Sequence, residues 1–272
     1  MYDIFSSVSP LWGICPFDYI GPGRLIDCAA KRRLPENPRS IIMFAFPYLL
    51  PEEDYEGLNV SKYAAVRDYH GVAAERLSAA CEKLKDKYPG EEFVFFADNS
   101  PLPEVMAAVG AGIGVRGANS LLITEKYGSY VFIGEIVTTL EIAANSPSPS
   151  KCTGCGLCEK ACPVGAIKGG VITREKCLSH ITQKKGELSP EEEEIIKKTG
   201  CAWGCDICQN VCPLNKGAKP TEIGEFLADP KANVTPSDPI EGRAFAWRGE
   251  KVIKRNLGIL EKKAEEDESE RI

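Results

Sequence analysis

Apolar residues in the first half of the chain recur at two spacings, one typical of strands and one of helices. Ser40–Phe46 is a short apolar run rich in branched side chains and ended by Pro47, which predicts a buried strand. Phe93–Phe96 has the same character. Ser61–Lys87 predicts an amphipathic helix, whose apolar face carries Val72, Leu77, Ala80, Cys81 and Leu84.

The pattern continues as a mixture of helix and strand. Pro101–Val109 predicts a helix, with Ser100 as N-cap and Pro101 at the first helical position. Leu121–Thr124 and Tyr130–Thr139 predict two strands joined by a turn over residues 125–129. Residues 1–146 are therefore expected to form an α+β domain.

Composition divides the rest of the chain. The Ser/Pro run Ser146–Ser150 reads as a linker. Nine of the 12 cysteines lie between Cys152 and Cys212, so residues 147–217 are expected to form a cysteine-rich domain.

Residues 218–272 are expected to form a helical tail. Thr221–Leu227 and Ala244–Lys263 are the predicted helices, and the charged end KKAEEDESERI is expected to fray.

Charge and hydropathy narrow the classes of function. No apolar run is long enough for a membrane span, and no basic segment precedes an apolar one at the N-terminus, so we expect a cytoplasmic protein. Clustered cysteines then favour metal binding over disulfides. The net charge of −6 disfavours broad non-specific nucleic-acid binding, although a local patch such as Lys31, Arg32 and Arg33 could still meet a phosphate backbone.

The run from Cys152 to Pro163 has the spacing C-x2-C-x2-C-x3-C-P found in bacterial ferredoxins. Three closely spaced thiolates can wrap one cubane, while the fourth projects towards a second cluster. A second motif ends in C-x2-C-x3-C-P at Pro213. The spacing predicts two [4Fe–4S] clusters, one held by Cys152, Cys155, Cys158 and Cys212 and the other by Cys162, Cys205 and Cys208. Zinc is the alternative, but zinc sites do not need this spacing.

The second predicted cluster lacks one ligand, and two cysteines compete for the place. Cys201 stands at C-x3-C spacing from Cys205, whereas Cys177 lies between the two motifs. Spacing alone slightly favours Cys201.

Two further patterns are weaker. Gly112–Gly117 fits G-x-G-x-x-G, but it follows a predicted helix and opens a predicted strand, the reverse of a dinucleotide site. We interpret it as a tight loop that lets backbone approach a neighbour, such as a ligand, closely. Asp68–Gly71 partly matches a cobalamin-ligating D-x-H-x-x-G pattern, with Ala73 in the glycine position, so we interpret His70 as a helix-face or satisfied polar residue.

Three acidic residues are candidates for chemistry. Asp98 follows the strand FVFF and precedes SPLPE, where it either caps backbone amides or acts as a general acid, a role that requires a raised pKa. Glu104 and Glu135 are open to a structural interpretation, and Glu135, inside an apolar strand, needs a partner.

Taken together, these segments resemble the epoxyqueuosine reductase (QueG) family of cobalamin-dependent iron–sulfur enzymes, as a short member lacking most of the C-terminal helical-repeat region. The matching stretches are YAAVRDYH (63–70), ADNSPLPE (97–104), GAGIGVRGANSLLI (110–123), GSYVFIGEI (128–136), the first cysteine run, KCLSH (176–180), GCDICQNVCPLN (204–215) and RNLGIL (255–260).

The resemblance implies a nitroreductase-like domain that binds cobalamin, a ferredoxin-like 2[4Fe–4S] domain and a short helical tail. It implies reduction of epoxyqueuosine in tRNA, in which clusters pass electrons to cobalamin, low-valent cobalt acts on the epoxide carbon and Asp98 protonates the leaving oxygen. It selects Cys177 over Cys201 for the second cluster. It also implies a ferredoxin or flavodoxin as electron donor, and cofactor contacts from Asp98, Gly112, Gly114, Gly117, Asn119, Ser129 and Glu135.

The chain departs from the family pattern in three ways. Only one or two helices follow the cysteines, a basic N-terminal stretch that contacts cobalamin has no counterpart, and Ala118 replaces a lysine of the glycine loop. Three other functions therefore stay open: a cobalamin-dependent reductase of another substrate, an electron-transfer protein without its own chemistry, and, by fold analogy alone, a flavin-binding reductase.

Overall fold

A four-stranded antiparallel sheet organises the first half of the protein, in a computed structural model that describes residues 1–269. Its strand order is β1 (Leu11–Pro16), β2 (Ser40–Pro47), β6 (Val131–Thr138) and β3 (Phe93–Ala97). All eight residues of β2 are buried, because this strand has partners on both edges and helices over both faces. A continuous apolar run is what such a position requires, so the strands predicted at 40–46 and 93–96 are confirmed.

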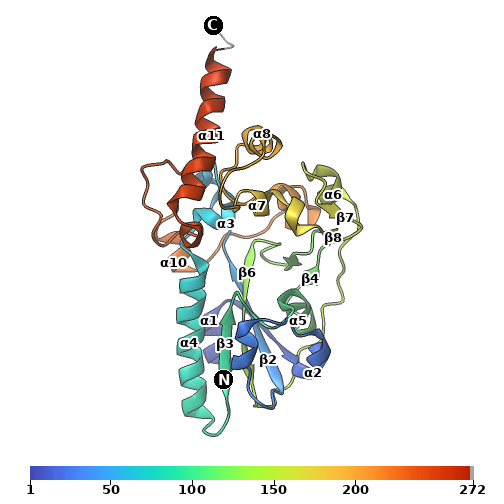
Figure 1. Ribbon diagram of the computed structural model, residues 1–272. Helices are drawn as coiled ribbons and strands as arrows, with labels where there is room; N and C mark the ends of the chain where they lie inside the picture. Colours follow the sequence, from blue (N-terminus) through green and yellow to red (C-terminus); the bar gives the residue numbers. More distant parts are fainter. Residues whose placement is uncertain (270–272) are drawn as a thin grey trace.

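Helices cover both faces of the sheet (Figure 1). Alternate residues of β2 point to opposite sides, Phe44 towards α1 (Tyr2–Val8) and α4 (Tyr69–Lys87), and Met43 towards α2 (Phe17–Ile20) and α5 (Glu104–Gly110). The α+β class expected from the sequence is therefore present.

The long helix predicted over 61–87 is in fact two helices. α3 (Lys62–Ala65) ends before Asp68, whose carboxylate accepts a hydrogen bond from the backbone N–H of His70 and caps α4. The N–H of Asp68 donates to the carbonyl of Gly242 at 2.7 Å, which replaces the helical bond that a continuous helix would make. The break places His70 in the first turn of α4.

Two other predicted boundaries are wrong. The helix predicted from Pro101 begins only at Glu104, since Pro103 disfavours helical backbone at the preceding residue. Ser100 does not cap that helix; its hydroxyl accepts from the N–H of Leu102 instead. The two strands predicted at 121–124 and 130–139 are present as β5 (Leu122–Ile123) and β6, with an antiparallel bridge from Thr124 to Gly128 in the turn between them, but β5 pairs with β4 (Val115–Arg116) and not with β6.

The cysteine-rich part lies at one end of the sheet (Figure 1). It consists of short elements, because ligand loops rather than a large core determine its path: α6 (Leu157–Ala161), β7 (Ile167–Lys168), β8 (Val171–Ile172), α7 (Leu178–Ile181), α8 (Pro190–Thr199) and α9 (Ile207–Asn210). α8 has a full capping box between Ser189 and Glu192.

Both predicted helices of the tail begin later than expected. α10 covers only Gly224–Leu227, and α11 (Glu250–Ser269) begins after Gly249, whose φ of 82° interrupts the helix predicted from Ala244. Residues 270–272 of the end expected to fray lie outside the described part of the chain.

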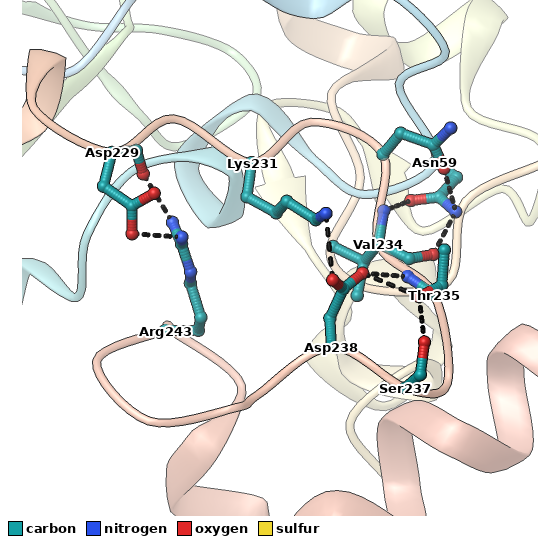
Figure 2. Close-up of polar contacts among 9 residues, drawn as sticks. Asn59, Asp229, Lys231, Val234, Thr235, Ser237, Asp238 and Arg243 are labelled. Carbon is teal, nitrogen blue, oxygen red and sulfur yellow. Dashed lines mark hydrogen bonds and ion pairs between the residues drawn. The ribbon is translucent and has the colours of Figure 1, made fainter.

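Polar contacts order the tail and attach it to the first half of the chain (Figure 2). Two ion pairs lie within the tail, Arg243 with Asp229 at 2.6 Å and Lys231 with Asp238 at 2.9 Å. Asn59, outside the tail, donates to the carbonyl of Val234 at 2.7 Å. The fully buried Trp203 packs in one core with α3 and α11. The tail thus shares its core with both preceding parts.

Candidate iron–sulfur and reductase site

The first four predicted ligands surround one small cavity. Its lining includes Cys152, Cys155, Cys158 and Cys212. Gly154 and Gly156 have φ of 65° and 73°, which turns the chain around the cavity before α6. Cys212, from the end of the second motif, completes the group across 54 residues of sequence from Cys158 (212 − 158).

The other predicted thiols form a second group. Cys205 lies close enough to Cys177 and Cys162 for each of them to raise its pKa, after burial, which is the larger cause. Cys205 and Cys177 likewise help to raise the pKa of Cys208, for which burial is again the larger cause. Cys177, which begins α7, is thus among the second group of thiols.

Cys201 lies within electrostatic reach of Cys205, but its thiol is already engaged by the backbone. Its thiol donates to the carbonyls of Trp203 at 3.3 Å and Gly204 at 3.5 Å, and burial raises its pKa to about 12. A buried thiol that is already hydrogen-bonded to backbone behaves as an inert structural cysteine.

The donor chemistry fits iron–sulfur clusters. Among the described residues no three Cys, His, Asp or Glu side chains gather tightly enough to hold a single metal ion. A cubane cluster instead separates its four thiolates by its own iron and sulfide atoms. Asn119 lines the first cavity, and its buried Nδ2 has no oxygen or nitrogen partner among the described residues. The Asn119 side chain instead lies close enough to Cys208 to oppose the rise in the pKa of that thiol, as expected for a donor aimed at a thiolate.

The predicted glycine loop borders a larger cavity of about 580 Å³. Its lining includes Gly112, Gly114 and Lys151, and it shares Ile123 and Leu214 with the first cysteine cavity. The loop follows α5 and opens β4, which confirms that it is not a dinucleotide motif.

The glycines themselves serve the fold. A Cβ on Gly112 would lie 2.3 Å from the carbonyl oxygen of Ser146, and one on Gly117 2.3 Å from Oδ1 of Asn119. The close approach expected of this loop is therefore to the protein's own atoms, and the cavity lies beside it.

Two of the predicted cofactor contacts are buried. Ser129 donates to Gln209 at 2.9 Å and accepts from Asn215 at 2.8 Å, so it connects the segment before β6 to the cysteine-rich part. Glu135 has no exposed surface. Both side chains are therefore engaged inside the protein, and their contact with a cofactor stays a prediction.

Asp98 forms a charged triad with His70 and Asp68. Nδ1 of His70 lies 2.6 Å from Asp68 and Nε2 lies 3.2 Å from Asp98. Because each ring nitrogen faces a carboxylate, both must carry a proton to donate, which makes the ring an imidazolium. The bonds to Asp68 and then Asp98 raise the pKa of His70 to about 9.

This arrangement changes what the general-acid interpretation of Asp98 requires. The hydrogen bond from His70 lowers the pKa of Asp98, so that the raised pKa expected from the sequence is absent and the proton lies on His70. Asp98 does not cap α5, whose N-cap is Pro103, but its carboxylate accepts from the backbone N–H of Asn99. His70 is more than an ordinary helix-face residue, because it holds the proton next to Asp98. Asp98 and Asn99 have φ of 59° and 46°, a left-handed turn that aims the carboxylate at His70.

A second acidic pair lies behind Asp98. Ser100 donates to Oε1 of Glu135, but Oε2 finds no donor on the described residues. An unsatisfied buried oxygen costs roughly 1–3 kcal/mol. Its neighbour Glu104 offers a donor only when protonated, and burial followed by the charge of Asp98 raises the pKa of Glu104 to about 7. Glu104 and Glu135 therefore share a proton.

The shared proton predicts a pH-dependent stability. The folded-state pKa of Glu104 lies above its ordinary value of 4.5, so the stabilisation is complete below pH 4.5 and is lost as the pH rises to about 7. We expect the free energy of unfolding to fall by about 1–3 kcal/mol across that window. Urea unfolding measured at several pH values checks this, with Glu104→Gln as control. The glutamine donates at every pH, so a slope in the variant equal to that of the wild type would contradict the shared proton.

Comparison with known proteins identifies the family. Residues 151–215 match the model of a 4Fe–4S double cluster binding domain, and residues 29–99 match the epoxyqueuosine reductase QueG domain DUF1730. The chain therefore carries an iron–sulfur domain of the double-cluster kind, preceded by a segment that matches the QueG family.

Relatives cover most of the chain. The epoxyqueuosine reductase of Listeria monocytogenes is 36% identical over 248 residues, 83% of this chain and 64% of that protein. The Synechocystis enzyme is 35% identical over 219 residues, 78% of this chain and 71% of its own. A solved epoxyqueuosine reductase with an epoxyqueuosine-modified tRNA stem loop has a TM-score of 0.76 at 26% identity, covering 95% of this chain and 80% of that one.

This chain belongs to the epoxyqueuosine reductase family. It spans 64% of the length of the Listeria relative. No helix in the described part of the chain is long and apolar enough to cross a membrane.

Proposed function

We propose that the protein is an iron–sulfur reductase that removes the epoxide oxygen of epoxyqueuosine in RNA with the help of cobalamin. The observation that carries this proposal is that the first cysteine cavity, the cavity beside the glycine loop and the region around Asp98 adjoin one another. The first cysteine cavity shares Ile123 and Leu214 with the cavity beside the glycine loop, and that loop connects through α5 to the residues around Asp98.

The two thiol groups give the protein an electron path. Cys152, Cys155, Cys158 and Cys212 would hold one [4Fe–4S] cluster, and Cys162, Cys177, Cys205 and Cys208 the other. Cys158, in the first group, helps to raise the pKa of Cys208, in the second group, so the two groups lie near each other. This supports clusters close enough to exchange electrons. A ferredoxin or flavodoxin is the proposed donor.

The cavity beside the glycine loop supports cobalamin binding. Gly112, Gly114 and Lys151 would hold part of that cofactor, and bound cobalamin would supply a low-valent cobalt that transfers the electrons to the substrate.

The charged triad would supply one of the two protons that the reaction consumes, and the solvent the other. Converting an epoxide to an alkene takes two electrons and two protons and releases the oxygen as water. The proton held at Nε2 of His70 passes to Oδ2 of Asp98, and the resulting carboxyl group donates it to the departing oxygen. The imidazolium keeps this proton available at neutral pH.

The test has two stages on anaerobically reconstituted protein. Cob(II)alamin is first mixed with the protein and gel-filtered, and we expect it to co-elute at about one per chain. A tRNA stem loop carrying epoxyqueuosine is then incubated with the complex and a reductant, and queuosine is measured by mass spectrometry. Cobalamin left behind with intact clusters would favour the electron-transfer function, and cobalamin bound without turnover would favour another substrate.

A further inference from the structure

A pocket of about 180 Å³ lies beside α7 and borders the second thiol group at one residue. Cys177 lines it, but Cys162, Cys205 and Cys208 do not. The remaining lining consists of Ile172 and five side chains with hydrogen-bond donors and no carboxylate, namely Arg174, Ser179, His180, Gln183 and Arg248. Such a lining suits an anion.

Arg248 has donor capacity that the protein does not use. Its Nε is buried without a hydrogen-bond partner, although a guanidinium can donate five hydrogen bonds. Its guanidinium carbon lies 3.8 Å from the ring centroid of Trp247, which is 58% exposed. An aromatic ring in water beside a basic pocket is the arrangement on which nucleic-acid bases stack.

The pocket lies near the proposed reaction centre. Arg174 helps His70 to lower the pKa of Asp98, so its charge is within electrostatic reach of that carboxylate. Gln183 donates to the hydroxyl of Tyr63 at 3.4 Å, and the ring of Tyr63 packs edge-on against Phe132. Tyr69, next to His70, stacks on the ring of Phe132, and the two ring centroids are 4.0 Å apart. A chain of side-chain contacts therefore joins the pocket to His70.

We propose that this pocket binds a backbone phosphate of the RNA substrate and that Trp247 stacks on a neighbouring base. This inference rests on the proposed function and specifies how the RNA is held. Guanidinium groups bind phosphate in paired hydrogen bonds, and a phosphate seated at Arg174 and Arg248 holds the adjacent nucleotide near Asp98. An acidic electron-donor protein could also bind the positive charges of Arg174 and Arg248, but its binding would not require the exposed ring of Trp247.

Fluorescence anisotropy of a labelled tRNA anticodon stem loop tests the proposal on the cluster-loaded protein. We expect Arg248→Gln to weaken binding about tenfold and to reduce the slope of log K against log salt by about one. Trp247→Ala should weaken binding about fivefold or more. Lys83→Gln, which removes an equal charge more than three turns along α4 from His70, is the matched control and should bind like the wild type. Iron content verifies that each variant is folded.

Three outcomes overturn the proposal. Equal affinity for Arg248→Gln and Lys83→Gln would remove the phosphate site. Unchanged RNA binding with slower reduction of the clusters by flavodoxin would assign the pocket to the donor protein. Binding of inorganic phosphate that RNA does not displace would assign it to a free anion. Arg248-dependent RNA binding without conversion of epoxyqueuosine would instead support the pocket while contradicting the proposed function.

Discussion

Cys177→Ala is expected to halve the iron content of the reconstituted protein, to about four atoms per chain, whereas Cys201→Ala should retain about eight. Sequence spacing slightly favours Cys201 as the fourth ligand, and the family resemblance favours Cys177. The structure offers a physical reason for the second choice. Cys177 lies within electrostatic reach of Cys205 and Cys208, while the thiol of Cys201 is hydrogen-bonded to two backbone carbonyls.

Iron and acid-labile sulfide are measured together with the electron paramagnetic resonance spectrum of the reduced protein. Two nearby clusters couple magnetically, so the wild type and Cys201→Ala should give a broadened spectrum and Cys177→Ala the signal of an isolated cluster. Loss of iron in Cys201→Ala with full iron in Cys177→Ala would reverse the assignment. Loss in both would mean that Cys201 holds the loop from Trp203 to Cys205 in place.

Local patterns predicted the central strand and the thiols for different reasons. Ser40–Pro47 is buried over its whole length, so its apolar run needs no knowledge of its neighbours. The cysteine motifs place ligands within one loop of each other, which spacing alone encodes. The β4–β5 pairing was not predicted, because two-residue strands carry too little pattern to select a partner.

Long-range contacts account for what the sequence could not reveal about the site. His70 was assigned to mid-helix because the predicted helix runs through Asp68. Contacts with the distant tail end α3 instead, since the carbonyl of Ala65 accepts from Lys231 and the N–H of Asp68 donates to Gly242. The pairing of His70 with Asp98 spans 28 residues, and that of Glu104, in α5, with Glu135, in β6, joins two elements that are also distant in the sequence. Glu135 inside an apolar strand was the one available signal for a hidden partner.

Asp98→Asn is expected to lower kcat about 10²-fold or more while clusters and RNA affinity are retained. Asparagine tolerates the φ of 59° at this position, and 57% of the Asp98 side chain is exposed, so the substitution should not disturb the fold. The amide cannot take up the proton of His70 and pass it on. Single-turnover conversion of epoxyqueuosine, followed by mass spectrometry, measures the effect.

His70→Gln separates a proton reservoir from a structural contact. In the wild type kcat should fall as the pH rises through about 9, because the raised pKa of His70 means that its proton is present below that value and lost above it. The glutamine variant should have a kcat lowered about 10-fold or more and should lack this decline. Combined with Asp98→Asn it should add little, since both residues act on one proton. A pH profile unchanged by His70→Gln would leave His70 as a support for the Asp98 turn, and unchanged turnover in Asp98→Asn would require a different proton donor, for which Glu104 is the nearest acid with a raised pKa.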